Sequence, residues 1–321
     1  MKYIDLHCDT LMQAFLAQQK DIATLEKAMV DLDRLEKGGC MAQFFAIFMP
    51  PMAYRAKYGS ALPDDETYIR LLHGILMNTI QLYPGRLALA KSAGDLAANA
   101  GKISAFLTLE DGRAVDGKLE NLDRFFDLGV RLISLTWNEA NCLGAPNSAD
   151  PAVMAQGLTP FGRDAVRRMN ELGMIVDVSH LSDGGFWDVA ELSDRPFVAS
   201  HSNCRSLCAH PRNLTDEMIR ALADRGGVAG LNFNPPFLEE GGTHGAVQRI
   251  ADHARHLADV GGLGCVALGT DFDGIRGTFD VGSPDKMDLL FTALQKVGFT
   301  QDQVEQIAWG NAQRLIRDVC S

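Results

Sequence analysis

Short apolar segments alternate along the chain with longer segments whose polar and apolar residues follow helical spacing. The apolar segments have the length and composition of buried strands, and turn residues bound most of them. Eight strands are predicted, at about residues 3–6, 41–48, 103–109, 130–136, 174–179, 195–200, 227–233 and 266–269. Strands and helices that alternate eight times are typical of a (β/α)8 barrel, in which helices surround a ring of parallel strands.

Helix signals between the strands support this interpretation. Acidic residues at 64–66 predict the start of a helix of about eighteen residues, since negative charge is favoured at a helix N-terminus. Thr215 is the expected N-cap of another helix, and a helix over 160–172 should end at Gly173. Residues 52–64, with their proline and glycine, predict a loop.

The end of the chain adds helices to the barrel pattern. Three helical segments, at about 285–297, 301–308 and 309–318, follow the last strand. Because no change of composition divides the chain, we expect residues 1–321 to form one α/β domain, a TIM barrel with extra C-terminal helices. A doubly wound open sheet is the alternative, but no Gly-x-Gly-x-x-Gly turn joins a strand to a helix.

The composition narrows the classes of function. The chain has 321 residues, of which 46% are hydrophobic, and a net charge of −11 that argues against nucleic acid or an anionic membrane as partner. It has no signal-peptide pattern and no apolar run of membrane-spanning length, and its seven cysteines are scattered. We therefore expect a cytoplasmic protein with reduced thiols. A homodimer is also expected, although no pattern in the sequence specifies it.

Six side chains that can bind metal ions come directly after predicted strands. In a barrel, the C-terminal ends of the strands meet at the face where active sites are built. The six residues follow strands one, three, five, six and eight: His7, Asp9, Glu110, His180, His201 and Asp271. Three imidazoles with two or three carboxylates exceed the needs of one zinc ion and suit two ions roughly 3.5–4 Å apart.

The order of the strands suggests how these ligands divide between two ions. Glu110 comes from a strand between the two histidine-bearing groups, so we expect it to bridge the ions. His7 and Asp9 would hold one ion, and His180 and His201 the other. For His7 and Asp9 an alternative remains open, in which they satisfy the N-terminus of the helix that follows.

Other polar residues receive different interpretations. Asp177, within strand five, is either an inward-facing polar residue or a partner of a ligating histidine. Asp273 is expected to satisfy its own loop, and His210, in the loop after strand six, is a candidate substrate contact. The remaining histidines are interpreted as surface residues: His73, His244, His253 and His256.

Six short motifs give the chain a resemblance to the membrane (renal) dipeptidase family of zinc peptidases. They follow one another in the family's order, at residues 5–10 (DLHCDT), 109–112 (LEDG), 177–182 (DVSHLS), 199–203 (ASHSN), 211–214 (PRNL) and 269–274 (GTDFDG). The resemblance implies a (β/α)8 barrel that binds two zinc ions and hydrolyses dipeptides, in some members those with a D-residue at the C-terminal position. It also implies that Arg212 binds the C-terminal carboxylate of the substrate, and that Asp271 is the catalytic residue that transfers protons.

The chain departs from this family pattern after strand four. Well-known animal members have a histidine there that can contact the substrate carbonyl, whereas this chain has Trp137. An indole N–H can donate a hydrogen bond but cannot deliver a proton to a leaving group. Asn138 or Asn141 is expected to supply the missing donor, and Asn138 and Asn234 are the expected further substrate contacts.

The predicted function is therefore zinc-dependent hydrolysis of free-carboxylate dipeptides, with L-Xaa-D-Xaa among the candidates, by a hydroxide that bridges the two ions. One alternative is another metal-dependent amidohydrolase, such as a lactamase, an N-acyl-amino-acid hydrolase or a deaminase. Deaminases usually open with His-x-His, whereas this chain has His-x-Asp at residues 7–9. A metal-holding protein that binds peptides without cleaving them is the other alternative, against which the presence of Asp271 argues, because binding alone needs no proton transfer.

Overall fold

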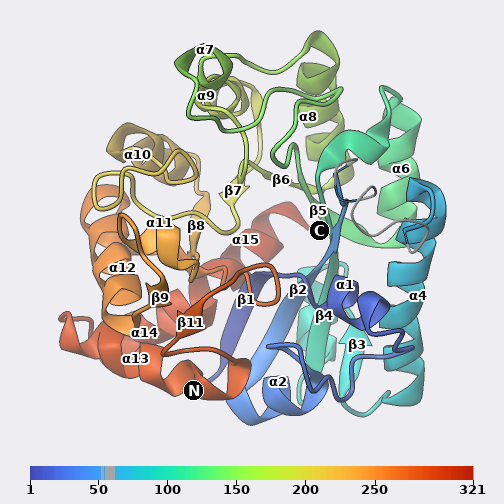
Figure 1. Ribbon diagram of the computed structural model, residues 1–321, viewed down its shortest axis with the longest axis vertical. Helices are drawn as coiled ribbons and strands as arrows, with labels where there is room; N and C mark the ends of the chain where they lie inside the picture. Colours follow the sequence, from blue (N-terminus) through green and yellow to red (C-terminus); the bar gives the residue numbers. More distant parts are fainter. Residues whose placement is uncertain (52–53, 55–61, 321) are drawn as a thin grey trace.

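The apolar segments of the sequence lie side by side as the parallel strands of a closed barrel (Figure 1). The computed structural model describes residues 1–51, 54 and 62–320. The barrel strands are β1 (Tyr3–Cys8), β2 (Cys40–Phe48), β4 (Ile103–Glu110), β5 (Val130–Ser134), β6 (Ile175–Asp177), β7 (Val198–Ala199), β8 (Val228–Leu231) and β10 (Val266–Leu268). The ring closes because β1 pairs with both β10 and β2, and β2 pairs with β4. The predicted fold class and all eight predicted strands are confirmed.

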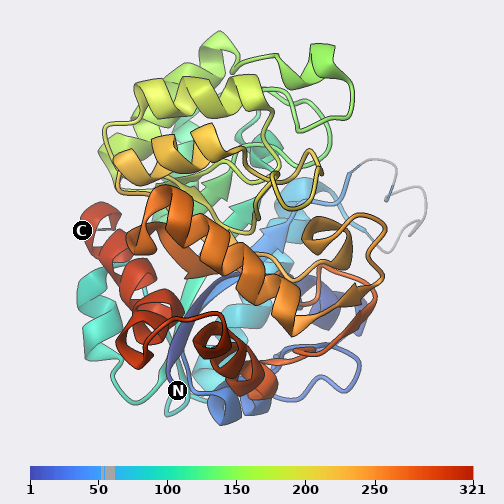
Figure 2. The same ribbon diagram turned by 90° about the vertical axis from the view of Figure 1, so that its left-hand side faces the viewer.

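Helices surround the barrel on all sides (Figures 1 and 2). In chain order they are α1 (Thr10–Leu16), α2 (Leu32–Gly38), α4 (Asp65–Leu82), α5 (Ala93–Ala98), α6 (Leu119–Leu128), α7 (Pro151–Met154), α8 (Pro160–Leu172), α9 (Asp183–Leu192), α10 (Asp216–Asp224), α11 (Pro235–Leu238), α12 (Val247–Gly261), α13 (Met287–Lys296), α14 (Gln301–Glu305) and α15 (Asn311–Val319). A π-helical turn at Gln306–Gly310 joins α14 to α15. No helix within residues 1–51, 54 and 62–320 combines the length and the apolar character needed to cross a membrane.

Local signals in the sequence set several helix ends as predicted. The side chain of Thr215 accepts a hydrogen bond from the backbone N–H of Met218 and caps α10. Helix α8 ends at Gly173, whose φ of 75° lies in the left-handed region that glycine enters without strain. Helix α4 has the expected 18 residues. The predicted loop 52–64 falls largely on residues 52–53 and 55–61, which lie outside the described residues.

Three short strands were not predicted from the sequence. β3 (Leu87–Leu89) pairs with the first residues of β4, outside the ring of eight. β9 (His244–Gly245) and β11 (Thr278–Phe279) form a separate two-stranded sheet. All three have only two or three residues. Such segments are too short for a periodic pattern, so sequence periodicity could not identify them.

Two apolar layers hold the barrel together. The outer layer packs outward-facing strand residues against the surrounding helices. The inner layer includes Ile4, Phe44, Phe106 and Leu132, and it packs against α15, which lies near the centre of the view in Figure 1. Side chains alternate between the two faces of a strand, so Glu110, four residues beyond Phe106, continues the inward-facing series toward the C-terminal end of the barrel.

The first strand is irregular just before the predicted metal ligands. Its pairing with β2 shifts register between Asp5 and Cys8, so β1 carries one more residue than β2 over this stretch. Such a bulge changes the direction in which the following side chains point. Cys8, beside His7, is fully buried in the layer beneath the helices. The bulge therefore includes His7, in the last residues of β1 before the barrel mouth.

Candidate active site

Glu110, the last residue of β4, lies among three imidazole rings. Its Oε1 is 3.1 Å from Nε2 of His180 and 3.8 Å from Nε2 of His201, and its Oε2 is 3.6 Å from Nε2 of His7. All four side chains are buried. Strands β1, β4, β6 and β7 thus bring side chains from distant parts of the sequence to one point, as the strand-end pattern predicts.

Two further carboxylates lie beside His7. Its Nε2 is 3.6 Å from Oδ2 of Asp9 and 3.8 Å from Oδ1 of Asp271. Two groups of side chains therefore present ligand atoms within 4.8 Å of one another: His7, Glu110 and His201, and His7, Asp9 and Asp271. Asp9 precedes α1 but its side chain makes no capping hydrogen bond to that helix, which removes the alternative in which it serves as a helix cap.

Several polar atoms of this cluster have no hydrogen-bond partner among the described residues. They include both ring nitrogens of His7, Oδ1 of Asp9 and Oε2 of Glu110, all of which are buried. A buried polar atom without a partner costs roughly 1–3 kcal/mol, and such atoms in a native fold need an explanation, for example an ion. Imidazole nitrogens and carboxylate oxygens are the ligands that zinc and similar divalent cations prefer. The residues present therefore fit a metal centre.

The charges in the cluster are also unbalanced in a way that a cation would relieve. Burial, together with the carboxylate of Asp9, raises the pKa of Glu110 well above its usual value. Burial by itself would lower the pKa of His7, but the carboxylates of Glu110 and Asp9 outweigh it and raise that pKa to about 10. Burial lowers the pKa of His180 and of His201 well below the usual value, so both rings are neutral, which is the form that binds metals.

Two residues of the cluster adopt an unusual backbone conformation. His180 has a φ of 69° and Asp271 a φ of 61°, in the left-handed region that residues other than glycine seldom occupy. Such a conformation costs on the order of 1–3 kcal/mol and persists where the surroundings enforce it, often at functional sites. The Asn232 amide, for example, donates a hydrogen bond of 2.9 Å to Oδ2 of Asp271. Burial raises the pKa of Asp271 to about 6.

Arg212 is a buried cation without a carboxylate partner among the described residues. Its guanidinium donates to Oγ of Ser202 at 3.2 Å and to the His201 carbonyl at 3.3 Å, lies over the Phe237 ring at 5.4 Å, and leaves Nε unpaired. Burial lowers its pKa to about 10. A buried arginine of this kind can bind the carboxylate of a ligand with two parallel hydrogen bonds.

A cavity of about 580 Å³ lies over the cluster. Glu110, His180, Asp271 and the predicted substrate contacts Asn138 and Asn234 all line it. Its other walls combine apolar residues, among them Met12, Leu16, Phe48, Trp137, Phe237 and Ile275, with the polar residues Asp9, Gln13, Asp273 and Arg276. A second cavity of about 470 Å³, which reaches Arg212 and His210, shares Asn138, His180 and Phe237 with the first. The space over the cluster is therefore open to a small polar molecule on both sides of His180.

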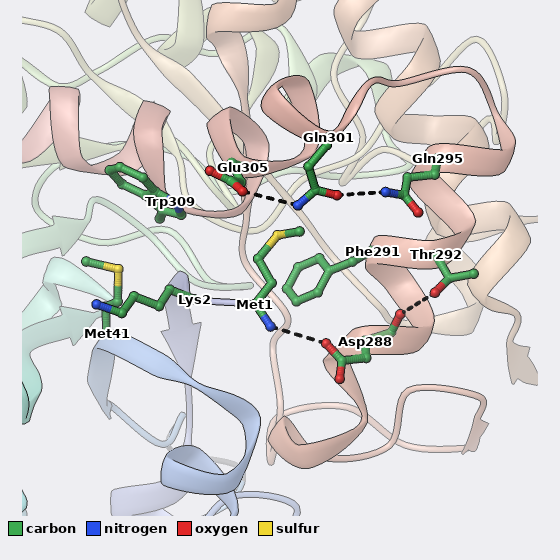
Figure 3. A pocket seen from close by; sticks show the side chains of 10 residues that line it. All are labelled: Met1, Lys2, Met41, Asp288, Phe291, Thr292, Gln295, Gln301, Glu305 and Trp309. Atoms are coloured by element: carbon green, nitrogen blue, oxygen red, sulfur yellow. Dashed lines mark hydrogen bonds and ion pairs between the residues drawn. The ribbon is translucent and has the colours of Figure 1, made fainter.

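Another cavity, of about 620 Å³, lies at the opposite end of the barrel, where β1 and β2 begin (Figure 3). In Figure 3, the amino group of Met1 points toward Asp288, and Gln301 bridges Glu305 and Gln295. None of the ten side chains that line this cavity is a predicted site residue. The predicted chemistry thus lies entirely at the C-terminal ends of the strands.

The structure narrows the choice of donor beside Trp137. Asn141 uses its amide group for Asp111 and for the Leu135 carbonyl, both at 2.8 Å, so it is not free to contact a substrate. Asn138 places Oδ1 3.1 Å from Nδ1 of His180 and lines both cavities. The Trp137 ring itself lies 5.1 Å from the Phe48 ring and forms an apolar wall.

The structure supports one of the two expectations for Asp177, because its carboxylate contacts the predicted ligand His201 through Ser200. Asn232, by contrast, was not predicted at all, although it follows β8 as the other site residues follow their strands. Asp273 was expected to satisfy its own loop, but its side chain instead accepts hydrogen bonds from Thr10 and from the backbone of Met29, which lie far from it in the sequence.

The interpretation of His253 as a surface residue is wrong. Its side chain is buried, with Nδ1 3.2 Å from the backbone nitrogen of Cys204 and Nε2 3.0 Å from the Leu238 carbonyl. His253 precedes Ala254 on α12 and lies one turn from Ile250 and Leu257, so it shares the apolar face of that helix. This spacing was the signal in the sequence that could have identified it as buried.

Comparison with known proteins places the chain among dipeptidases. The profile of the membrane dipeptidases (peptidase family M19) matches residues 1–321. Dipeptidase tcpJ of Claviceps purpurea is 30% identical over 328 residues, which cover 99% of this chain and 73% of the relative. An uncharacterized protein from the pqqA 5' region of Klebsiella pneumoniae is 36% identical over 256 residues, which cover 76% of this chain and 93% of the relative.

Two solved structures resemble the whole chain. The crystal structure of dipeptidase AC, a metallopeptidase of family M19, matches with a TM-score of 0.88 and 26% identity, over 100% of this chain and 99% of the other. A metallopeptidase from Rhodobacter sphaeroides, crystallised with a phosphinate mimic of the dipeptide L-Ala-D-Ala, matches with a TM-score of 0.87 and 26% identity, over 99% of both chains.

Proposed function

The chain belongs to the membrane dipeptidase family, peptidase family M19, and is a metallodipeptidase, and on this premise we propose that it hydrolyses dipeptides with a free carboxylate in the cavity over Glu110. The observation that carries the proposal is that a metal-binding cluster and the buried Arg212, which has no carboxylate partner among the described residues, line two cavities that meet at His180. Residues 1–321 would act as one catalytic domain.

We assign the metal ligands according to the strands that supply them. His7 and Asp9 would hold one Zn²⁺ ion and His180 and His201 a second. Glu110 would bridge them, since its Oε2 lies nearer His7 and its Oε1 nearer His180. When bound, the two ions would lower the pKa of the attacking water toward 7 and polarise the carbonyl of the substrate. The unpaired atoms of His7, Asp9 and Glu110 support this assignment.

Arg212 would hold the substrate by its C-terminal carboxylate. The guanidinium lies beside the second cavity, next to the backbone of His201, and has no competing carboxylate partner among the described residues. A bidentate pair in a buried site fixes both the position and the direction of the bound carboxylate. This would restrict the site to short peptides, because the scissile bond has to reach Glu110 from an anchored C-terminus.

Asp271 would move the proton that hydrolysis requires. It lies in the wall of the cavity, its Oδ1 is 3.8 Å from His7, and Asn232 holds its other oxygen. A carboxylate with a pKa near the working pH can accept a proton from the attacking water and donate it to the departing amine. The raised pKa of Asp271, about 6, supports this role.

Asn138 and Asn234 would complete the substrate contacts. Asn138 directs Oδ1 to His180, so its amide N–H groups are left to donate to the substrate carbonyl, in the place of the histidine that Trp137 replaces. Asn234 lines the same cavity and makes no capping hydrogen bond with its side chain. The Rhodobacter sphaeroides relative binds a mimic of L-Ala-D-Ala, and we extend L-Xaa-D-Xaa dipeptides to this chain on that basis.

Metal analysis combined with a matched substrate panel tests the proposal. We expect two metal ions per chain and hydrolysis of L-Ala-D-Ala or L-Ala-L-Ala. We also expect much weaker hydrolysis of the same dipeptides as C-terminal amides, which lack the carboxylate that Arg212 would bind. One bound metal, or activity only on cyclic amides, would contradict the proposal and favour a different amidohydrolase.

A further inference from the structure

A chain of hydrogen bonds beneath the site links His201 to a fully buried carboxylate. Nδ1 of His201 is 2.7 Å from Oγ of Ser200, and that hydroxyl lies 2.5 Å from Oδ2 of Asp177. All three side chains have 0% exposure, so water does not compete for these groups. These hydrogen bonds lie on the Nδ1 side of the His201 ring, whereas Glu110 faces its Nε2.

The directions of these hydrogen bonds can be deduced from the donors around Asp177. Its Oδ1 accepts the backbone N–H groups of Ser179 and Ser200, both at 2.9 Å, while Oδ2 receives the hydroxyls of Ser134 at 2.6 Å and Ser200 at 2.5 Å. A carboxylate accepts hydrogen bonds, and a serine hydroxyl has one proton to donate. Ser200 therefore gives its proton to Asp177 and offers only lone pairs to His201.

This arrangement fixes the position of the proton on His201. Because the Ser200 oxygen can only accept, Nδ1 of His201 must carry the ring proton, and Nε2 keeps its lone pair. Nε2 is the nitrogen that faces Oε1 of Glu110, at 3.8 Å. A neutral imidazole binds a metal through a nitrogen that bears a lone pair, and the other nitrogen's hydrogen bond selects which one that is.

We propose that Asp177 and Ser200 are positioning residues that hold His201 in the tautomer whose Nε2 binds metal. The inference rests on the proposed metal centre but concerns residues that do not touch the metal. Ser134 provides a contrast, because it donates to the same Asp177 oxygen yet is not hydrogen-bonded to His201.

The Asp177→Asn variant would reverse the direction of the hydrogen bonds between Asp177, Ser200 and His201, although the side chain at position 177 would keep almost the same shape. The two backbone N–H groups require the remaining oxygen, so the new NH₂ group would face the hydroxyls of Ser134 and Ser200. Ser200 would then accept a hydrogen bond from this NH₂ group and donate its own proton to Nδ1 of His201. The ring proton would move to Nε2, which would have to lose that proton before it could bind a metal.

Chelator competition on the full-length protein measures the predicted effect. In Asp177→Asn, we expect one of the two bound Zn²⁺ ions to bind about 10–100-fold more weakly, the usual cost of removing such an outer partner. Ser134→Ala removes a hydrogen bond to the same carboxylate oxygen and should keep both ions at wild-type affinity. Wild-type affinity for both ions in a folded Asp177→Asn protein would overturn the proposal.

A measurement on the metal-free wild-type protein keeps this inference separate from the proposed function. Nitrogen-15 NMR of labelled histidine rings distinguishes the two tautomers, and the signal of His201 can be assigned as the one that changes in Ser200→Ala. We expect the proton on Nδ1 in the wild type and in Ser200→Thr, which keeps the hydroxyl, and on Nε2 in Asp177→Asn. A wild-type proton on Nε2 would overturn the positioning role. Failure of the wild type to bind any metal would instead contradict the proposed metal centre.

Discussion

Nε2 of His180 lies 3.0 Å from Nε2 of His201, a distance at which one neutral imidazole normally donates a hydrogen bond to the other. Here Nδ1 of each ring faces a hydrogen-bond acceptor. The acceptor is Oδ1 of Asn138 for His180 and Oγ of Ser200 for His201. Both rings therefore carry their proton on Nδ1, and two lone pairs face each other at this distance. Such an arrangement is unfavourable unless a cation binds beside them, so this part of the fold is organised for a metal ion.

Removal of metal should destabilise the protein as well as inactivate it. Bound cations stabilise the folded state by about 2.7 kcal/mol per site when their free concentration is 100 times the Kd. Calorimetry of the protein with and without a chelator should show a lower Tm after metal removal, with both Tm and dipeptidase activity restored by added Zn²⁺. An unchanged Tm in protein shown to be metal-free would contradict the proposal that bound metal stabilises the fold by compensating the buried negative charges of Glu110 and Asp9.

The positions of the metal-binding side chains could be predicted because each follows a strand. The apolar runs before Glu110 and His201 reveal two strands, and the geometry of a barrel brings their ends together. Asp177 was one candidate partner of a ligating histidine, but its link to His201 through Ser200 could not be predicted, because such a hydrogen bond leaves no periodic trace in the sequence. The burial of Arg212 and its lack of a carboxylate partner likewise depend on which side chains surround its loop, and the sequence alone does not show which these are.

The Asp271→Asn variant should lose turnover while it keeps its metal. The amide cannot accept and return a proton, and loss of a general acid or base typically costs 10²–10⁴-fold in rate. The near-identical shape of the amide would preserve the space beside His7 and the contact with Asn232. Steady-state kcat and metal content, measured on the same preparation, check this expectation. Normal kcat would remove Asp271 from the proposed mechanism, and loss of metal would make it a ligand instead.

Arg212→Ala should weaken the binding of free dipeptides. Truncation of one partner of a buried, hydrogen-bonded charge pair costs about 2 kcal/mol or more, which corresponds to roughly a 30-fold rise in KM. The comparison between a dipeptide and its C-terminal amide isolates the carboxylate, because the amide should lose little from the substitution. An equal rise in KM for both substrates would mean that Arg212 supports the site through Ser202 and the His201 backbone and does not bind the carboxylate.

Gly274→Ala should damage the site without introducing any charge. A Cβ atom at Gly274 would overlap Oδ2 of Asp9 and would lie 2.5 Å from Oδ1 of Asp271, so both carboxylates would have to move. We expect reduced metal content together with reduced kcat, since Asp9 is a proposed ligand and Asp271 the proposed proton carrier.

Gly74→Ala is the matched control for this substitution. Gly74 lies on α4, and a Cβ there would meet nothing within 4 Å. An alanine in a helix is favoured over glycine by about 0.5–1 kcal/mol, so this variant should be slightly more stable and fully active. If Gly274→Ala also kept wild-type metal content and kcat, the close approach of the chain at Gly274 would not be needed to position Asp9 and Asp271.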